Sequence, residues 1–220
     1  MASVALPEPY RLADKTLAAL NKKIVLRFNR AKRALLHDGF DELTVFRSFE
    51  DLYKGLIQDN DDAFRGLCAD RYREMYLYLK RSWPDRERLD DLVEMYLANL
   101  LTEPNGRTHY AYDSESLRKR DRAVEAINSE TQKSKKDLEF EKAMRYWSQQ
   151  TGFYIDIIAD EMAVKAMKDC GVKRVRWRTQ TDDKVCNDCH DRDGVVYDID
   201  EVPDKHLRCR CWLEPIATTG

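Results

Sequence analysis

Four cysteines and one histidine near the C-terminal end of the sequence have a spacing that suits a metal ion. Cys186 and Cys189 form a C-x-x-C pair, the segment 190–205 follows, and His206 then precedes Cys209 and Cys211. Zn²⁺ takes four cysteine or histidine ligands in a tetrahedron, and a two-residue spacer lets both side chains of a tight turn reach one ion. The spacing therefore predicts a zinc-binding site whose ligands are Cys186, Cys189, His206 and Cys209.

The fourth ligand of this site is open between two residues. On an extended chain successive side chains point to opposite sides, so Cys209 and Cys211 would be poor simultaneous ligands. The H-x-x-C spacing mirrors the C-x-x-C pair and favours His206, with Cys211 as the alternate fourth ligand. Because protein groups fill all four positions, we expect a structural metal and no enzyme activity.

The composition indicates a soluble, helix-rich protein. Of 220 residues, 43% are hydrophobic, 35% are charged and only 8 are glycine, which is typical of a folded helical chain. The net charge of −2 excludes a uniformly basic nucleic-acid binder. No apolar window is long enough to span a bilayer, and the first residues lack the order of a signal peptide. We therefore expect no membrane contact and synthesis in the cytoplasm, where clustered thiols bind metal more often than they pair as disulfides.

Helical periodicity covers most of the first 170 residues. Apolar residues recur at steps of three and four, which is typical of helices with one buried face. The segment 102–112 contains Pro-Asn-Gly and is expected to be a loop, and Thr151-Gly152 is expected to separate two helices. The expected helices span residues 14–37, 61–81, 85–101, 113–150 and 153–170.

After these helices the periodicity changes to that of a strand. Val175, Trp177 and Thr179 alternate with arginines, which predicts a half-buried strand with one cationic side. An Asp-Gly turn leads into a second expected strand at 195–197, and a third is expected at 212–213.

The predicted fold is mainly α, with a small β part. A multi-helix body is expected over residues 1–171, and a zinc-stabilised β-ribbon over residues 172–220. Such a ribbon is too small to hold itself together by burial of apolar surface, so a metal could organise it. The chain is therefore expected to be an α+β protein.

Charge is distributed unevenly along the first 62 residues. The segment 15–37 holds seven lysines or arginines and no acid, whereas 38–62 holds eight acids and two basic residues. The basic helix could contact DNA or an acidic partner, but antiparallel pairing of the two segments explains the same charges and is favoured. The candidate DNA or partner contacts, including the arginines of the predicted strand, are Lys22, Lys23, Arg27, Arg30, Arg174, Arg176 and Arg178.

The residues around the predicted metal site form a C-terminal signature. In sequence order they are Trp177, Thr179, Asp183, Cys186, Cys189, Asp193-Gly194, Pro203, His206 and Cys209-Arg210-Cys211. This order resembles the signature of phage head morphogenesis (minor capsid) proteins of the Mu F-like class. The resemblance covers about residues 157–213, and it is specific because the ligand spacing, the Asp-Gly turn and the Cys-Arg-Cys ending coincide. The family commonly has His-Pro before that ending, where this sequence has His206-Leu207.

The resemblance implies a structural function. Members of the family are few-copy capsid components associated with the portal and with head assembly, and some contact or enter with DNA. The implied partners are therefore the portal protein, capsid components and packaged DNA. The implied location is the virion, inside the head or near the portal, after synthesis in the cytoplasm of a bacterial host.

A zinc-stabilised nuclease of the H-N-H type is the alternative function. It would require Asp193, His206 and neighbouring acids to form a metal-dependent centre. The sequence contains no P-loop, no G-x-G-x-x-G and no G-x-S-x-G motif. We therefore favour a structural role over catalysis.

Overall fold

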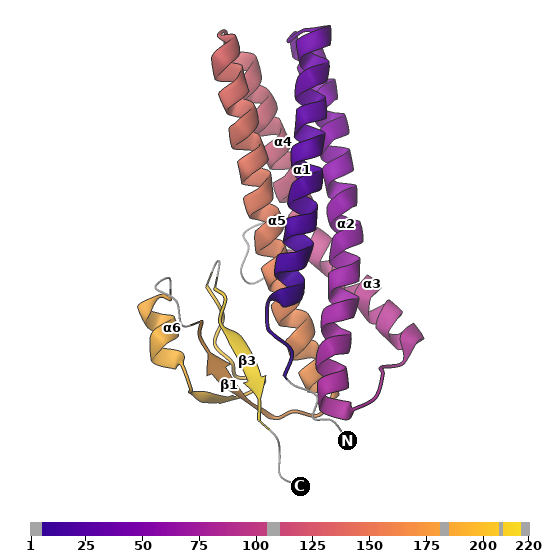
Figure 1. Cartoon of the computed structure of the whole chain (residues 1–220), viewed down its shortest axis with the longest axis vertical. Helices are drawn as coiled ribbons and strands as arrows, with labels where there is room; N and C mark the ends of the chain where they lie inside the picture. Colours follow the sequence, from indigo (N-terminus) through magenta and orange to yellow (C-terminus); the bar gives the residue numbers. More distant parts are fainter. Residues whose placement is uncertain (1–5, 105–110, 181–184, 207–208, 217–220) are drawn as a thin grey trace.

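The computed structural model describes residues 6–104, 111–180, 185–206 and 209–216. Figure 1 shows long helices that run along one another as an elongated bundle, with a further helix and a small sheet beside its lower end. The bundle consists of α1 (Arg11–Asp38), α2 (Glu42–Lys80), α4 (Tyr112–Ser129) and α5 (Lys133–Asp169), and α3 (Arg86–Thr102) lies beside it. Within the described ranges, no helix combines the length and the apolar composition that crossing a membrane requires.

Two local features fix the antiparallel turn between α1 and α2. Gly39 follows α1 at φ 105°, a conformation that favours glycine, and its N–H donates to the carbonyl oxygen of Leu35 (3.0 Å). Asp41 caps α2, because its carboxylate accepts the backbone N–H of Thr44 (3.1 Å). α2 therefore begins at Glu42 and runs through the acidic segment, whereas the sequence pattern predicts a helix only from residue 61.

Aromatic side chains from α2, α4 and α5 form the centre of the bundle core. The ring of Tyr112 packs edge-on against Phe64, Trp147 and Tyr154, with centroid distances of 5.4, 6.3 and 4.9 Å. The buried amide of Asn60 donates to the Tyr112 hydroxyl (2.7 Å), so that this hydroxyl has a hydrogen-bond partner inside the core. These contacts join three helices at one level of the bundle.

α5 passes without interruption through Gly152, where the sequence predicts a boundary between helices. A Cβ on Gly152 would lie 3.3 Å from a methyl carbon of Leu17, so the glycine allows α1 to approach α5 closely. The chain breaks instead between α4 and α5, where the Glu130 carboxylate accepts the N–H groups of Thr131 (2.9 Å) and Gln132 (3.1 Å). Gly152 is therefore a packing feature and not a helix end.

A three-stranded antiparallel sheet follows the helices. It consists of β1 (Arg174–Arg178), β2 (Val196–Asp198) and β3 (Trp212–Pro215) in the order β2-β1-β3. Val175 pairs with Tyr197 of β2, and Trp177 pairs with Leu213 of β3. The side chains of Val175 and Trp177 are fully buried, as the alternating pattern predicts. The prediction of a mainly α protein with a small C-terminal β part is confirmed.

Candidate metal centre

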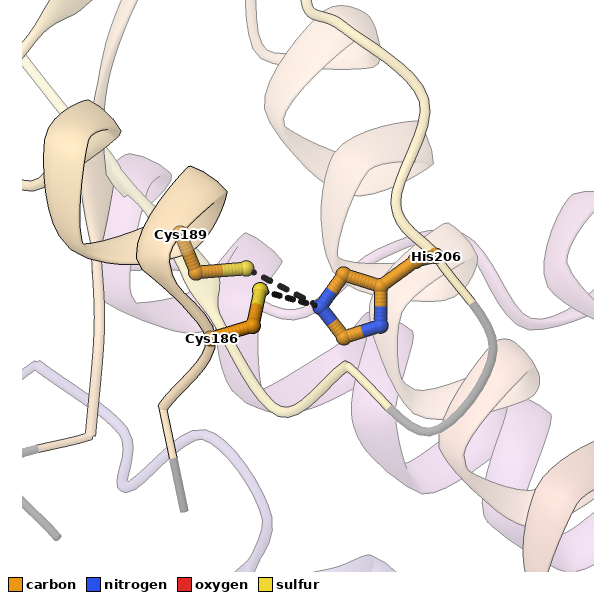
Figure 2. A group of neighbouring side chains, drawn as sticks. All are labelled: Cys186, Cys189 and His206. Atoms are coloured by element: carbon orange, nitrogen blue, oxygen red, sulfur yellow. Dashed lines mark hydrogen bonds between the residues drawn. The ribbon is translucent and has the colours of Figure 1, made fainter. Parts of the chain in front are cut away.

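The start of α6 (Asn187–Arg192) places Cys186 and Cys189. Cys186 is the N-cap of this short helix, with an extended backbone (φ −73°, ψ 159°), and its carbonyl oxygen accepts the N–H of His190 (3.0 Å). Cys189 lies three residues further on, so the two thiols reach the same side of the helix end. Figure 2 shows both thiols pointing toward the imidazole of His206, which comes from the segment between β2 and β3.

The ligating atoms of these three residues lie close to the positions that one metal ion requires. Nε2 of His206 is 3.1 Å from Sγ of Cys186 and 3.1 Å from Sγ of Cys189. In a tetrahedral zinc site, bonds of about 2.3 Å to sulfur and about 2.0 Å to nitrogen put neighbouring ligand atoms roughly 3.5–3.8 Å apart. The group therefore needs only small shifts to accept an ion of this size.

Cys189 also belongs to a second, buried group with Cys209 and Cys211. The Sγ atoms of Cys189 and Cys209 are 3.6 Å apart, and all three sulfur atoms lie within 4.8 Å of one another. The expectation that Cys209 and Cys211 point to opposite sides is therefore wrong. Alternation holds only along an extended strand, whereas the N–H of Cys209 donates to the carbonyl oxygen of His206 (3.1 Å) in a turn, and β3 begins only at Trp212.

The predicted ligands are thus divided between two groups that share Cys189. Cys186 and His206 lie with it in the more exposed group, and Cys209 and Cys211 in the buried one. Within the described ranges these are the groups of three or more such side chains that the fold brings together, and either could hold a metal ion. The choice between His206 and Cys211 as the fourth ligand stays a prediction.

Hydrogen bonds and burial set the proton affinities of the thiols. Acceptance of a hydrogen bond from the Cys211 thiol lowers the pKa of Cys209 to about 5, and the same bond raises the pKa of Cys211. The backbone N–H of Cys189 lowers the pKa of Cys186, whereas burial raises the pKa of the Cys189 thiol to about 12. Because the thiolate is the metal-binding form, a metal at neutral pH must displace a proton from Cys189.

The turn after α6 holds the C-x-x-C pair against the sheet. The carboxylate of Asp193 accepts the backbone N–H of Thr179 (2.8 Å). Gly194 adopts φ 80°, and its N–H donates to the carbonyl oxygen of Trp177 (2.9 Å). These bonds join the C-terminal end of α6 to β1 and to Thr179 just after it, and so hold the helix that carries Cys189 beside the sheet. Asp183, another residue of the C-terminal signature, lies outside the described residues.

The basic residues of α1 are partly paired with α2. Lys23 and Arg27 both form ion pairs with Asp59, at 3.2 and 2.5 Å. Arg27 reaches this carboxylate across Gly55, where a Cβ would collide with its guanidinium. Lys22 and Arg30, the other candidate contacts on α1, are exposed. Pairing between antiparallel segments therefore accounts for part of the basic helix.

The arginines of β1 are also partly neutralised. The register of the sheet sets Arg176 opposite Glu214 of β3. The guanidinium groups of Arg176 and Arg178 lie 3.4 and 2.8 Å from the Glu214 carboxylate, whereas Arg174 is exposed. The cationic side of β1 is therefore weaker than the sequence predicts, because the negative charge of Glu214, which is distant in the sequence, offsets part of it.

Three polar residues that the sequence pattern does not single out adjoin the centre. Asp160 of α5 and Lys205 are 6% and 8% exposed, and they form a buried ion pair at 2.7 Å. The hydroxyl of Tyr10 lies 2.8 Å from the same carboxylate. The available sequence signals are weak: Lys205 precedes His206, and Asp160 interrupts an otherwise apolar helix face.

Comparison with known proteins assigns no family to this chain, so its function has to be inferred from the residues of the metal centre. No protein-family model, curated protein or solved structure matches it.

Proposed function

We propose that the chain is a zinc-binding minor head protein of a tailed phage, with a structural role at or near the portal. The observation that carries the proposal is the convergence of a C-x-x-C pair and a later His-x-x-Cys pair: Cys186 and His206 lie in one group with Cys189 (Figure 2), and Cys209 lies in a second group with the same Cys189. The residues of that convergence are also those on which the family resemblance depends.

The donor set favours Zn²⁺ over Mg²⁺ or Ca²⁺, because thiolates and imidazole are soft or borderline ligands and carry no carboxylate oxygen. Cys189 belongs to both groups, and the sulfur of Cys209 lies at tetrahedral spacing from it. We therefore assign Cys186, Cys189, His206 and Cys209 as the ligands. When bound, the metal would cross-link α6 to the segment before β3.

Four protein ligands leave no position for a reacting water, which supports a structural role. The alternative H-N-H-type nuclease needs Asp193 and His206 in a catalytic centre. The Asp193 carboxylate caps the N–H of Thr179, and the His206 imidazole faces two thiols. These contacts support a structural role for both side chains over nuclease chemistry.

Metal analysis tests the zinc assignment. Protein purified under reducing conditions without chelator should contain one equivalent of zinc per chain, and removal of the metal should expose additional reactive thiols. Substantially less than one equivalent, in protein with intact thiols, would contradict the assignment. Protein carrying His206→Ala and Cys189→Ser together provides the zinc-free control.

Fractionation of phage particles tests the wider role. In cells that produce the phage, the protein should co-purify with portal or procapsid particles in few copies, and deletion of its gene should give defective or less infectious heads while portal synthesis continues. Absence from virions and procapsids alike, together with cleavage of plasmid DNA in Mg²⁺, would favour the nuclease instead.

The arginines of β1 allow the DNA contact to be separated from the portal contact. In wild type, DNA retention should fall steeply as salt rises. Replacement of Arg174, Arg176 and Arg178 by Gln should reduce DNA retention. Portal association should survive if the helical body makes that contact. The control is Glu214→Gln, which removes the shared partner of Arg176 and Arg178 without removing a cation.

A further inference from the structure

A tyrosine from the N-terminal segment contacts the backbone of the metal-binding loop, the segment between β2 and β3 that carries His206, Cys209 and Cys211. Tyr10 directly precedes α1, and its side chain is buried, with 3% of the residue exposed. Its hydroxyl oxygen lies 2.9 Å from the carbonyl oxygen of Cys211 and 2.8 Å from Oδ1 of Asp160. Both partners are acceptors, so the hydroxyl proton bridges the loop and α5.

Lys205 completes the same contact from inside the loop. Its ammonium donates to the carbonyl oxygen of Cys211 and forms the buried ion pair with Asp160. A buried ion pair is retained at a high desolvation cost, and removal of one member leaves an uncompensated charge. Groups from the N-terminal segment and from the loop therefore converge on one carbonyl oxygen, and the Asp160 carboxylate of α5 accepts from both of them.

The residue before Cys211 makes a second link to the bundle. The guanidinium of Arg210 pairs with Asp14 in the first turn of α1 (2.9 Å) and lies 4.5 Å from the centre of the Tyr10 ring. Arg210 and the neighbouring Cys211 carbonyl are thus attached to the same end of the bundle.

The sheet does not itself fix the Cys209–Cys211 segment. β3 begins at Trp212, one residue after Cys211, so the ladder of β1 and β3 does not include the cysteines. The hydrogen bonds from Tyr10 and Lys205 to the Cys211 carbonyl set the direction from which the chain enters β3, and hence where the Cys209 thiol lies. Contacts of this kind commonly set the affinity of a metal site by orienting its ligands.

We propose that Tyr10 and Lys205 are positioning residues of the metal centre, which hold the Cys209–Cys211 segment in ligating geometry through the carbonyl of Cys211. This inference rests on the proposed zinc site. By linkage, a contact that strengthens metal binding must itself be strengthened by the metal. Zinc therefore attaches the N-terminal segment more firmly to α5 and to the loop.

Tyr10→Phe tests the role of the hydroxyl, because it retains the ring under Arg210. Zn²⁺ affinity, measured by competition with a chromogenic chelator, should fall about tenfold. The matched control is Tyr72→Phe: the Tyr72 hydroxyl also donates to an α5 carboxylate, that of Asp169 (2.8 Å), and among the described residues it makes no hydrogen bond to the loop. This control should stay within about twofold of wild type in Zn²⁺ affinity.

A second variant and a second measurement separate positioning from simple docking. Lys205→Arg should retain most of the Zn²⁺ affinity, because the guanidinium preserves both the charge and the donors, whereas Lys205→Met should weaken it by at least as much as Tyr10→Phe. In wild type, addition of Zn²⁺ should slow amide hydrogen exchange around residues 10–14, and Tyr10→Phe should reduce this protection.

The outcomes are distinct. A Tyr10→Phe protein with lower thermal stability but unchanged Zn²⁺ affinity would overturn the inference, because the hydroxyl would then only dock the segment. Unchanged exchange at residues 10–14 on addition of Zn²⁺ would overturn it as well. A wild-type protein that binds no Zn²⁺ would instead refute the proposed metal site before any variant is compared.

Discussion

The helical body and the C-terminal sheet are held together by different means. In the body, large aromatic side chains such as Phe64, Tyr112 and Trp147 are completely buried between long helices. In the sheet region, Val175 and Trp177 are the completely buried apolar residues among those described, and much of the remaining interior consists of Cys189, Cys209 and Cys211. The body can rely on burial of apolar surface, whereas the sheet region buries less of it and would gain stability from the proposed metal and from its contact with the body.

This difference implies that the two regions should respond differently to the same kind of damage. Loss of a metal ligand should disorder the sheet region while most of the helices persist. A packing error in the bundle should lower the stability of the helices. The Asp160–Lys205 ion pair joins the two regions. Damage to one region should therefore also affect the other where the sheet contacts α5.

The largest effect is expected from loss of the shared ligand. Cys189→Ser should lower Zn²⁺ affinity on the order of a thousandfold, because Cys189 belongs to both candidate groups. Amide exchange should become fast over residues 185–216, while far-UV circular dichroism retains most of the helical signal. Cys170→Ser, at the end of α5 and outside both groups, is the control and should change neither quantity. Loss of most of the helical signal would show that the two regions are one folding unit.

The sequence predicts a side chain's position best where residues close to it in the chain determine that position. The spacing of Cys186 and Cys189 and the alternation around Trp177 are each explained within a few residues, and the structure places these side chains accordingly. The partial neutralisation of Arg176 and Arg178 depends on Glu214, which no local sequence pattern connects to them. Long-range partners of this kind become visible only when the strand register is known.

The next effect distinguishes the two candidates for the fourth ligand. His206→Ala should lower Zn²⁺ affinity roughly a hundredfold, whereas Cys211→Ser should change it by less than about threefold. Substitution of Co²⁺ for Zn²⁺ gives an independent measure, because the intensity of thiolate-to-cobalt charge transfer follows the number of bound sulfurs. Wild type and Cys211→Ser should match in this band. The opposite pattern of affinities would assign the fourth position to Cys211.

Glycines show why some element boundaries escape sequence analysis. Gly152 is a residue type that often ends a helix. Here it lies inside α5, and the absence of a side chain leaves space for Leu17 of α1. The real break at residues 130–132 contains neither glycine nor proline, and it is fixed by the side chain of Glu130. A glycine that ends a helix and one that admits a neighbour look alike in a single sequence.

A pair of glycine substitutions tests the packing of the body, with an intermediate effect. Gly152→Leu should lower the free energy of unfolding by about 1–3 kcal/mol, because the added side chain must displace Leu17. Gly66→Ala in α2 should raise it by about 0.5–1 kcal/mol, since nothing lies within 4 Å of the added Cβ. Chemical denaturation followed by circular dichroism measures both. Neither change should affect Zn²⁺ content, and loss of zinc from Gly152→Leu would contradict the separation of the two regions.

The smallest effect concerns a carboxylate where the two regions meet. Burial raises the pKa of Asp156 from 3.8 to about 6, although the nearby cations of Arg210 and Lys205 act in the opposite direction. A carboxyl pKa that is higher in the folded protein than in the unfolded chain means that folding disfavours the charged form. Asp156 therefore costs no stability well below pH 3.8, where both states are protonated, and its cost develops between that pH and about pH 6 and is complete above it.

Asp156→Asn should remove this cost. The free energy of unfolding, compared with wild type in chelator so that metal does not contribute, should be about 1–2 kcal/mol higher at pH 7.5 and equal at about pH 3. Asp121→Asn is the control, because Asp121 lies on the exposed face of α4, and it should have little effect at either pH. Destabilisation by Asp156→Asn at pH 7.5 would mean that attraction between Asp156 and Arg210 outweighs burial. The carboxylate would then be part of the attachment between the body and the metal-binding loop.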